Sequence, residues 1–98
     1  MNAQEAKAIT DDVNATILKR AEERAEEILR TVMQGVKETA GTGGYSFIHF
    51  VRGEFDSRVA DAILFRGESL GFKVEVRGSP LHYWLVRFIW GECNMPLN

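Results

Sequence analysis

Residues 82–90, His-Tyr-Trp-Leu-Val-Arg-Phe-Ile-Trp, carry the strongest structural signal in this 98-residue chain. Seven of these nine residues are large and apolar or aromatic, which is typical of a strand covered on both faces. Alternation along a strand divides them into Trp84, Val86, Phe88 and Trp90 on one face, and Tyr83, Leu85, Arg87 and Ile89 on the other. The stretch therefore predicts the central strand of a sheet.

Two more strands and a helix are predicted upstream of this stretch. Residues 45–51 are aromatic and β-branched, and residues 72–77 alternate between apolar and charged side chains. The first pattern indicates a strand, and the second indicates a half-exposed edge strand. Between them, residues 55–70 repeat apolar side chains at helical spacing, and Gly71 suits the residue that ends a helix.

The first 40 residues predict one long helix. Asn2 and Glu5 have the spacing of a capping box. Apolar side chains then recur every three or four residues, at Ile9, Val13, Ile17, Ala21, Ala25, Ile28, Val32 and Val36. The segment Thr10-Asp11-Asp12 is the one place where a second helix could start instead. The apolar stripe keeps its phase across that segment, which favours a continuous helix.

Together these elements predict an α+β fold of two layers, in which a long N-terminal helix is followed by β-α-β-β with a three-stranded mixed sheet. We expect the third strand to lie in the middle, antiparallel to both others. Residues 1–98 are expected to form a single domain. Its parts are the N-terminal helix and linker (1–40), the βαββ core (41–90) and a loose tail (91–98).

The predicted helix is longer than the sheet that it can cover. About 36 residues form a rod of about 54 Å, whereas a nine-residue strand spans about 30 Å. The apolar stripe nevertheless continues into the overhanging half, where it would be an unusual patch on a monomer. We therefore expect a homodimer or higher oligomer, with stripes paired in parallel or antiparallel, whose interface contains Ile9, Val13, Ile17, Leu18 and Ala21.

No catalytic or metal-binding constellation is predicted. The spacing of His49, His82 and Cys93 matches no zinc-ligand motif, and no serine has a histidine and a carboxylate positioned beside it in sequence. The glycine-rich residues 41–44 follow a helix, whereas a phosphate-binding loop precedes one. We therefore expect no enzyme activity, no metal and no cofactor.

Arg87 is the residue that most suggests a binding surface. It lies on an otherwise apolar strand, and arginine is rarely buried without a partner. Basic and aromatic residues on neighbouring strands or strand ends could bind a ligand or partner together with it: His49, Arg52, Lys73, Arg77 and Tyr83. Such a face can hold nucleotides or single-stranded nucleic acid. A structural salt bridge or a subunit contact is the alternative.

The overall composition narrows the class of partner. With a net charge of −2 and 27% charged residues, the chain is not expected to need nucleic acid or an anionic membrane as its partner. A single cysteine excludes an internal disulfide and fits a reducing compartment. The polar N-terminus does not resemble a signal peptide, and no apolar run is long enough to span a bilayer. We therefore expect a cytoplasmic protein.

The opening Asn-Ala-Gln-Glu-Ala-Lys at residues 2–7 with Thr10, and the run 71–74 leading to Ile89 and Trp90, resemble small phage and prophage proteins, most of them uncharacterised. The resemblance implies an accessory or host-interaction protein of the host-cell cytoplasm. Some small phage proteins of this sort bind nucleotide signals or inhibit host defence. The resemblance supplies no catalytic residues.

Three functions remain open at this point. The first is a small oligomeric interaction protein without catalytic activity that acts on a host factor. The second is a small-ligand or nucleotide binder with a site between subunits. The third is a single-stranded nucleic-acid binder that uses the sheet face, which the net charge disfavours.

Overall fold

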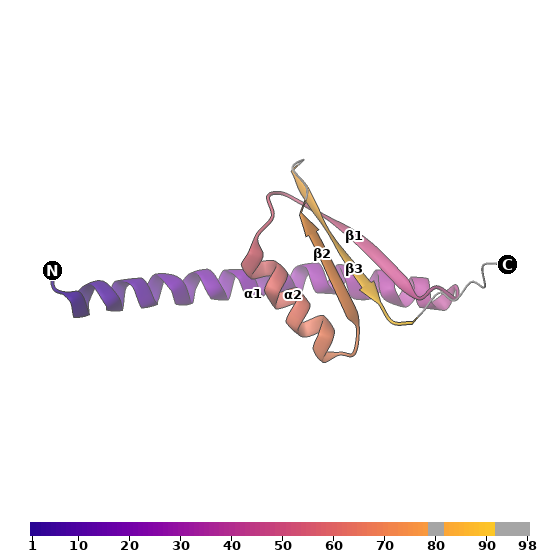
Figure 1. Ribbon diagram of the computed structural model, residues 1–98, viewed down its shortest axis with the longest axis horizontal. Coiled ribbons are helices and arrows are strands. Elements are labelled where there is room, and N and C mark those ends of the chain that lie inside the picture. Colours follow the sequence, from indigo (N-terminus) through magenta and orange to yellow (C-terminus); the bar gives the residue numbers. More distant parts are fainter. Residues whose placement is uncertain (79–81, 92–98) are drawn as a thin grey trace.

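The computed structural model describes residues 1–78 and 82–91. Its elements, in chain order, are α1 (Ala3–Gly41), β1 (Ser46–Arg52), α2 (Ser57–Ser69), β2 (Lys73–Gly78) and β3 (Tyr83–Ile89) (Figure 1). This order and the α+β class confirm the prediction. Apart from Gly91, the predicted tail (91–98) lies outside the described residues.

The three strands form one sheet in the order β1-β3-β2, and β3 pairs antiparallel with each neighbour. The most apolar strand is therefore central, as predicted. The expectation of a mixed sheet is wrong. Strands β1 and β2 run in the same direction, but β3 separates them, so no parallel pair of strands forms.

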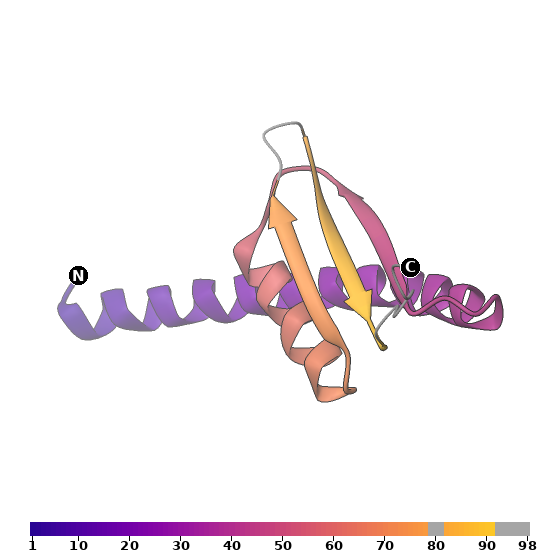
Figure 2. The ribbon, with the colours of Figure 1, turned by 45° about the vertical axis from the view of Figure 1, so that its right-hand side comes forward.

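Both helices cover the same face of the sheet, with α1 packed on β1 and α2 packed on β2 (Figures 1 and 2). The helices also pack on each other. In β3 the side chains of Trp84, Val86 and Phe88 are buried, whereas those of the alternate residues keep partial exposure. The prediction that both faces of this strand are covered is therefore wrong, since no described element covers the second face.

The core lies between the helices and the covered face. Its buried apolar side chains come from all five elements: Ala21, Ala25, Ile28, Leu29, Val32, Val51, Val59, Ala60, Ile63, Val74, Trp84, Val86 and Phe88. The aromatic ring of Phe55, just before α2, meets the indole of Trp84 edge to face, with ring centroids 5.6 Å apart. Burial of this kind supplies most of the free energy that stabilises a domain.

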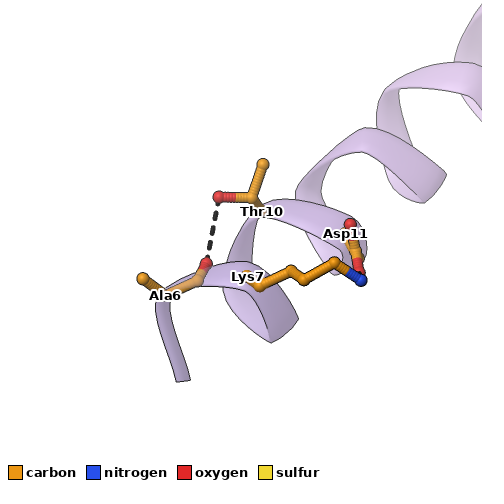
Figure 3. Close-up of polar contacts among 4 residues, drawn as sticks. All are labelled: Ala6, Lys7, Thr10 and Asp11. Atoms are coloured by element: carbon orange, nitrogen blue, oxygen red, sulfur yellow. Dashed lines mark hydrogen bonds and ion pairs between the residues drawn. The ribbon is translucent and has the colours of Figure 1, made fainter. Parts of the chain in front are cut away.

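Helix α1 is continuous through the predicted weak point. The Asn2 side chain accepts a hydrogen bond from the Glu5 backbone N–H at 2.9 Å, which confirms the predicted cap. Thr10 donates its hydroxyl to the Ala6 carbonyl oxygen at 3.0 Å, and Lys7 Nζ lies 3.3 Å from a carboxylate oxygen of Asp11 (Figure 3). The Thr10 hydroxyl therefore forms its hydrogen bond within α1. It does not cap a second helix.

Helix α2 is closed at both ends by its own sequence. The Asp56 carboxylate accepts hydrogen bonds from backbone N–H groups of the first turn. At the other end Gly71 has a positive φ of 91°. The Gly71 N–H donates to Glu68 O at 2.9 Å, and the Phe72 N–H donates to Gly67 O at 3.0 Å. This is the predicted Schellman motif, and it turns the chain directly into β2.

The N-terminal half of α1 extends beyond the rest of the molecule, with no other element beside most of its length (Figures 1 and 2). Ala21 is the first buried residue of the chain. The 18 helical residues before it correspond to about 27 Å of helix, within a molecule that measures 69 × 29 × 21 Å. The predicted mismatch between helix and sheet is therefore confirmed.

Candidate interaction surfaces

The first exposed apolar surface lies on the projecting half of α1. It consists of Ile9, Val13 and Ile17, whose exposed fractions are 53%, 51% and 37%. We call these three residues the N-terminal stripe.

Leu18 was also predicted for the interface and is exposed, but it points about 180° away from Ile9 around the helix and lines a groove with Phe65 of α2, so it does not belong to the stripe. Ala21, the fifth residue predicted for the interface, is only 5% exposed because it packs into the core of its own chain. It is therefore not part of this surface.

The N-terminal stripe winds around α1. Its members Ile9, Val13 and Ile17 lie four residues apart, so each points about 40° further around the helix than the one before. Glu5 and Asp12 lie four residues before and three residues after Ile9, and at these spacings they border it on the helix surface. The stripe is thus an apolar ridge with carboxylates beside its N-terminal end.

The second exposed surface is the face of the sheet opposite the helices, which we call the open sheet face. Successive strand residues point to opposite faces, so the buried residues identify its members as those that alternate with them. They are Ser46, Ile48, Phe50 and Arg52 of β1, Lys73, Glu75 and Arg77 of β2, and Tyr83, Leu85, Arg87 and Ile89 of β3.

Apolar side chains fill most of the middle of the open sheet face, with Arg87 at its centre and the other three cations toward its edges. Leu85 lies opposite Phe50 on one side and Arg77 on the other. The rings of Phe50 and Tyr83 meet edge to face, with centroids 5.8 Å apart, and Phe50 is 60% exposed. Four members of the face are cations, and Glu75 is the one carboxylate. The face is therefore apolar and basic.

Arg87 lies at the centre of this face, between Ile48 of β1 and Glu75 of β2. Its Nε atom is buried and has no hydrogen-bond partner among the described residues. A buried donor without an acceptor is unfavourable, and most such groups in folded proteins are satisfied. Arg87 is therefore positioned where an additional hydrogen-bond acceptor would stabilise it.

Five of the six residues predicted for binding share the open sheet face: Arg52, Lys73, Arg77, Tyr83 and Arg87. His49 does not join them. It lies opposite the buried Val86, so its side chain points to the face that the helices cover. Burial, and secondarily the positive charge of Arg24, lower the pKa of His49 below the usual histidine value of about 6.5.

Ile48 and Phe50 belong to the same face and were not among the residues predicted for binding. In β1, Phe47, His49 and Val51 alternate with Ile48, Phe50 and Arg52, so both faces carry apolar and basic side chains. Alternation shows which residues share a face, but here it does not show which face is covered. The pairing register between β1 and β3 identifies the covered face, because it shows which residues of β1 lie opposite the buried residues of β3.

Two further features are absent from residues 1–78 and 82–91. No group of three or more His, Cys, Asp or Glu side chains in this part of the chain is arranged to hold a metal ion. Neither of the helices described is both long and apolar enough to cross a membrane.

Comparisons with known proteins add no relative. No family model matches the sequence, and neither the curated proteins nor the solved structures contain a significant match.

Proposed function

We propose that the protein is a self-associating interaction protein without catalytic activity, and that the N-terminal stripe is the surface through which its copies associate. The observation that carries this proposal is the projecting half of α1, where the three apolar residues of the stripe contribute nothing to the core. Contiguous exposed apolar surface on a protein commonly marks an interaction site.

The physical properties of an isolated helix support the same proposal. A helix of about 18 residues without tertiary contacts is marginal in water, because packing of its apolar face supplies most of the stability of protein helices. The side chains of residues 3–20 are all exposed. A partner that covers the stripe would therefore stabilise both the helix and the assembly.

A second copy of the chain is the simplest such partner. Every copy presents the same stripe, and most soluble oligomers are built from identical chains related by closed symmetry. Action on a host factor, which the resemblance to small phage proteins implies, stays a prediction. So does binding of a nucleotide or other small ligand between subunits.

The test is the mass of the protein in solution. Light scattering and sedimentation should give at least twice the 11.1 kDa of one chain at concentrations on the order of tens of micromolar, within the range in which standard-size interfaces associate. A monomer at these concentrations would contradict the proposal.

A matched pair of double variants assigns the association to the stripe. Val13→Glu with Ile17→Lys places two charges on the stripe, and we expect at least a tenfold weaker association. Ala8→Glu with Ala15→Lys makes the same charge changes about 140–160° away around the helix from Val13, on exposed residues, and should leave association unchanged. Equal effects of the two pairs would show that the stripe is not the interface.

A further inference from the structure

We propose that the N-terminal stripe of one copy packs on the open sheet face of another copy. This inference rests on the proposed self-association and identifies the surface that receives the stripe. Within residues 1–78 and 82–91 two apolar surfaces are uncovered, one on a helix and one on a sheet, and packing a helix on a sheet is a standard way of burying both.

The two surfaces match in length. Residues 3–18 form about 24 Å of helix. Strands β1 and β3 have seven residues each, which corresponds to about 23 Å. One copy's projecting helix can therefore lie along the middle of the other copy's sheet, in the same two-layer contact that α1 and α2 make with the covered face.

Their charges are complementary. Residues 3–18 carry one lysine and three carboxylates, and Lys19 and Arg20 follow at the base of the projecting half, whereas the open sheet face carries four cations and Glu75. The Asp11 carboxylate lies 3.3 Å from Lys7 Nζ. The other two, Glu5 and Asp12, border the stripe and are positioned to meet cations around the apolar middle of the face. Opposite potentials of this kind favour a specific orientation of association.

Arg87 provides a third observation. Its Nε donor is buried at the centre of the open sheet face and lacks an acceptor within the described part of the chain. A helix laid over this face brings carboxylate and hydroxyl oxygens above it, because polar residues flank the stripe. The second copy thus supplies the type of group that Arg87 requires.

The residues of the face fit an apolar helix better than single-stranded nucleic acid. Nucleic acid binds such sheets by stacking bases on several aromatic rings along a cationic path. Here the two rings, Phe50 and Tyr83, lie toward one end, and the rest of the middle is aliphatic, at Ile48, Leu85 and Ile89. Glu75 adds a carboxylate beside Arg87, where a phosphate would be repelled.

The symmetry of the contact predicts the size of the assembly. The helix of one copy contacts the sheet of another, so a one-way contact would continue into open chains. Reciprocal exchange about a two-fold axis closes the assembly, since each copy then gives its stripe and receives its partner's. The expected product is a homodimer in which both surfaces of both copies are covered.

The first experiment introduces one charge on each of two exposed phenylalanines. Phe50→Glu places it on the open sheet face, and Phe65→Glu places it on α2, where Phe65 is 74% exposed. We expect Phe50→Glu to weaken the dimer at least tenfold, as the stripe variant does. Phe65→Glu should leave the dimer unchanged. Circular dichroism verifies that both variants remain folded.

The second experiment reverses the charges on both surfaces. Glu5→Lys with Asp12→Lys makes the border of the stripe basic, and Arg52→Glu with Arg77→Glu makes the edges of the face acidic. Each double variant alone should associate at least tenfold more weakly. An equimolar mixture should regain dimers, because in the heterodimer both helix-to-sheet contacts again join opposite charges.

A charge-matched control guards against general attraction between oppositely charged proteins. Asp11→Lys with Glu22→Lys gives the same change in net charge as the stripe-border variant, at exposed residues on another side of α1. Mixed with the variant of the face, it should restore no dimers. Restoration as strong as with the stripe-border variant would contradict the inference.

The outcomes separate this inference from the proposal on which it rests. If the stripe variant weakens association and Phe50→Glu does not, the stripes pair with each other, and only the inference fails. If neither variant weakens it, or only Phe50→Glu does, both fail. Suppose a mixed-sequence single-stranded oligonucleotide binds the protein, Phe50→Glu abolishes that binding, and the dimer persists. The face is then a nucleic-acid surface, and the inference is wrong.

Discussion

At the scale of single residues, Gly35 determines how closely α1 approaches the sheet. It is buried in the helix, and a Cβ atom added there would overlap the aromatic ring of Phe47 in β1. Glycine in a helix interior costs about 1 kcal/mol relative to alanine. Glycine is nevertheless needed at this position, because a side chain here would prevent the close contact between α1 and β1.

Replacing Gly35 with alanine should therefore destabilise the protein although alanine is the better helix former. We expect a loss of about 1–3 kcal/mol in the free energy of unfolding, as is typical of an overpacked core, measured by urea denaturation. Gly41→Ala in the same helix is the control, since nothing lies within 4 Å of the Cβ it would add. It should be neutral or stabilising by up to about 1 kcal/mol. Equal stability of the two variants would refute this role of Gly35.

His49 should make stability depend on pH. Burial and the nearby Arg24 lower its pKa below 6.5 in the folded state. Between that lowered pKa and about 6.5 the unfolded chain binds a proton that the folded chain does not. Its contribution to stability is thus fully present above about pH 6.5 and is lost as the pH falls through the lowered pKa.

The measurement compares urea denaturation of the protein and of His49→Gln at about pH 7.5 and about pH 5.5, on either side of the usual histidine pKa. The drop in stability on acidification should be smaller in the variant. The difference is expected to be modest because His49 keeps partial exposure. The same drop in both proteins would show that His49 is not responsible.

At the scale of elements, α1 consists of two halves with different partners. The half from Ala21 onward packs on β1 and α2, and the half before it contributes no side chain to the core. The Arg66 guanidinium of α2 lies 3.0 Å from the Glu26 carboxylate of α1. Because both groups are substantially exposed, this pair adds little beyond the apolar packing.

Removal of the first 15 residues tests this division. The shortened chain starts near Thr16 and retains every core residue, so we expect its free energy of unfolding to change by less than about 1 kcal/mol, measured on dilute, monomeric protein. Its ability to dimerise should be lost. A large loss of stability in the monomer would show that the removed half packs on its own core.

At the scale of the whole molecule, the chain is elongated and its charges are unevenly placed. It measures 69 × 29 × 21 Å, with carboxylates beside the N-terminal end of the projecting helix and cations on the open sheet face, although its net charge is only −2. The net charge of the chain does not reveal this separation of acidic and basic groups. The two features are exposed apolar surfaces, one with carboxylates beside its N-terminal end and the other with cations at its edges, and the proposed exchange between two copies would cover both.

The helices, the strands and most of the local geometry could be predicted from the sequence. Helical spacing predicted α1 through Thr10, and Asn2, Asp56 and Gly71 act at helix ends as their types suggest. The apolar content of residues 82–90 predicted the central strand. These features depend on neighbours in the chain, whose conformational preferences and hydrogen bonds are local, and the sequence carries that information directly.

Which surfaces are covered depends on how the helices and strands pack, and this could not be predicted from the sequence. Both faces of β1 carry apolar residues, so its alternation could not show that Phe47 faces the helices and Phe50 faces outward. The same ambiguity about β1 placed His49 in the predicted binding group. Ala21 was placed in the predicted interface because the sequence did not show how far the core covers α1. The periodicity of the sequence shows which face of its own helix or strand a side chain occupies. Whether that face is covered depends on how elements distant in the sequence pair and pack. The register with β3 and the position of α2 therefore had to be known before the open sheet face could be recognised.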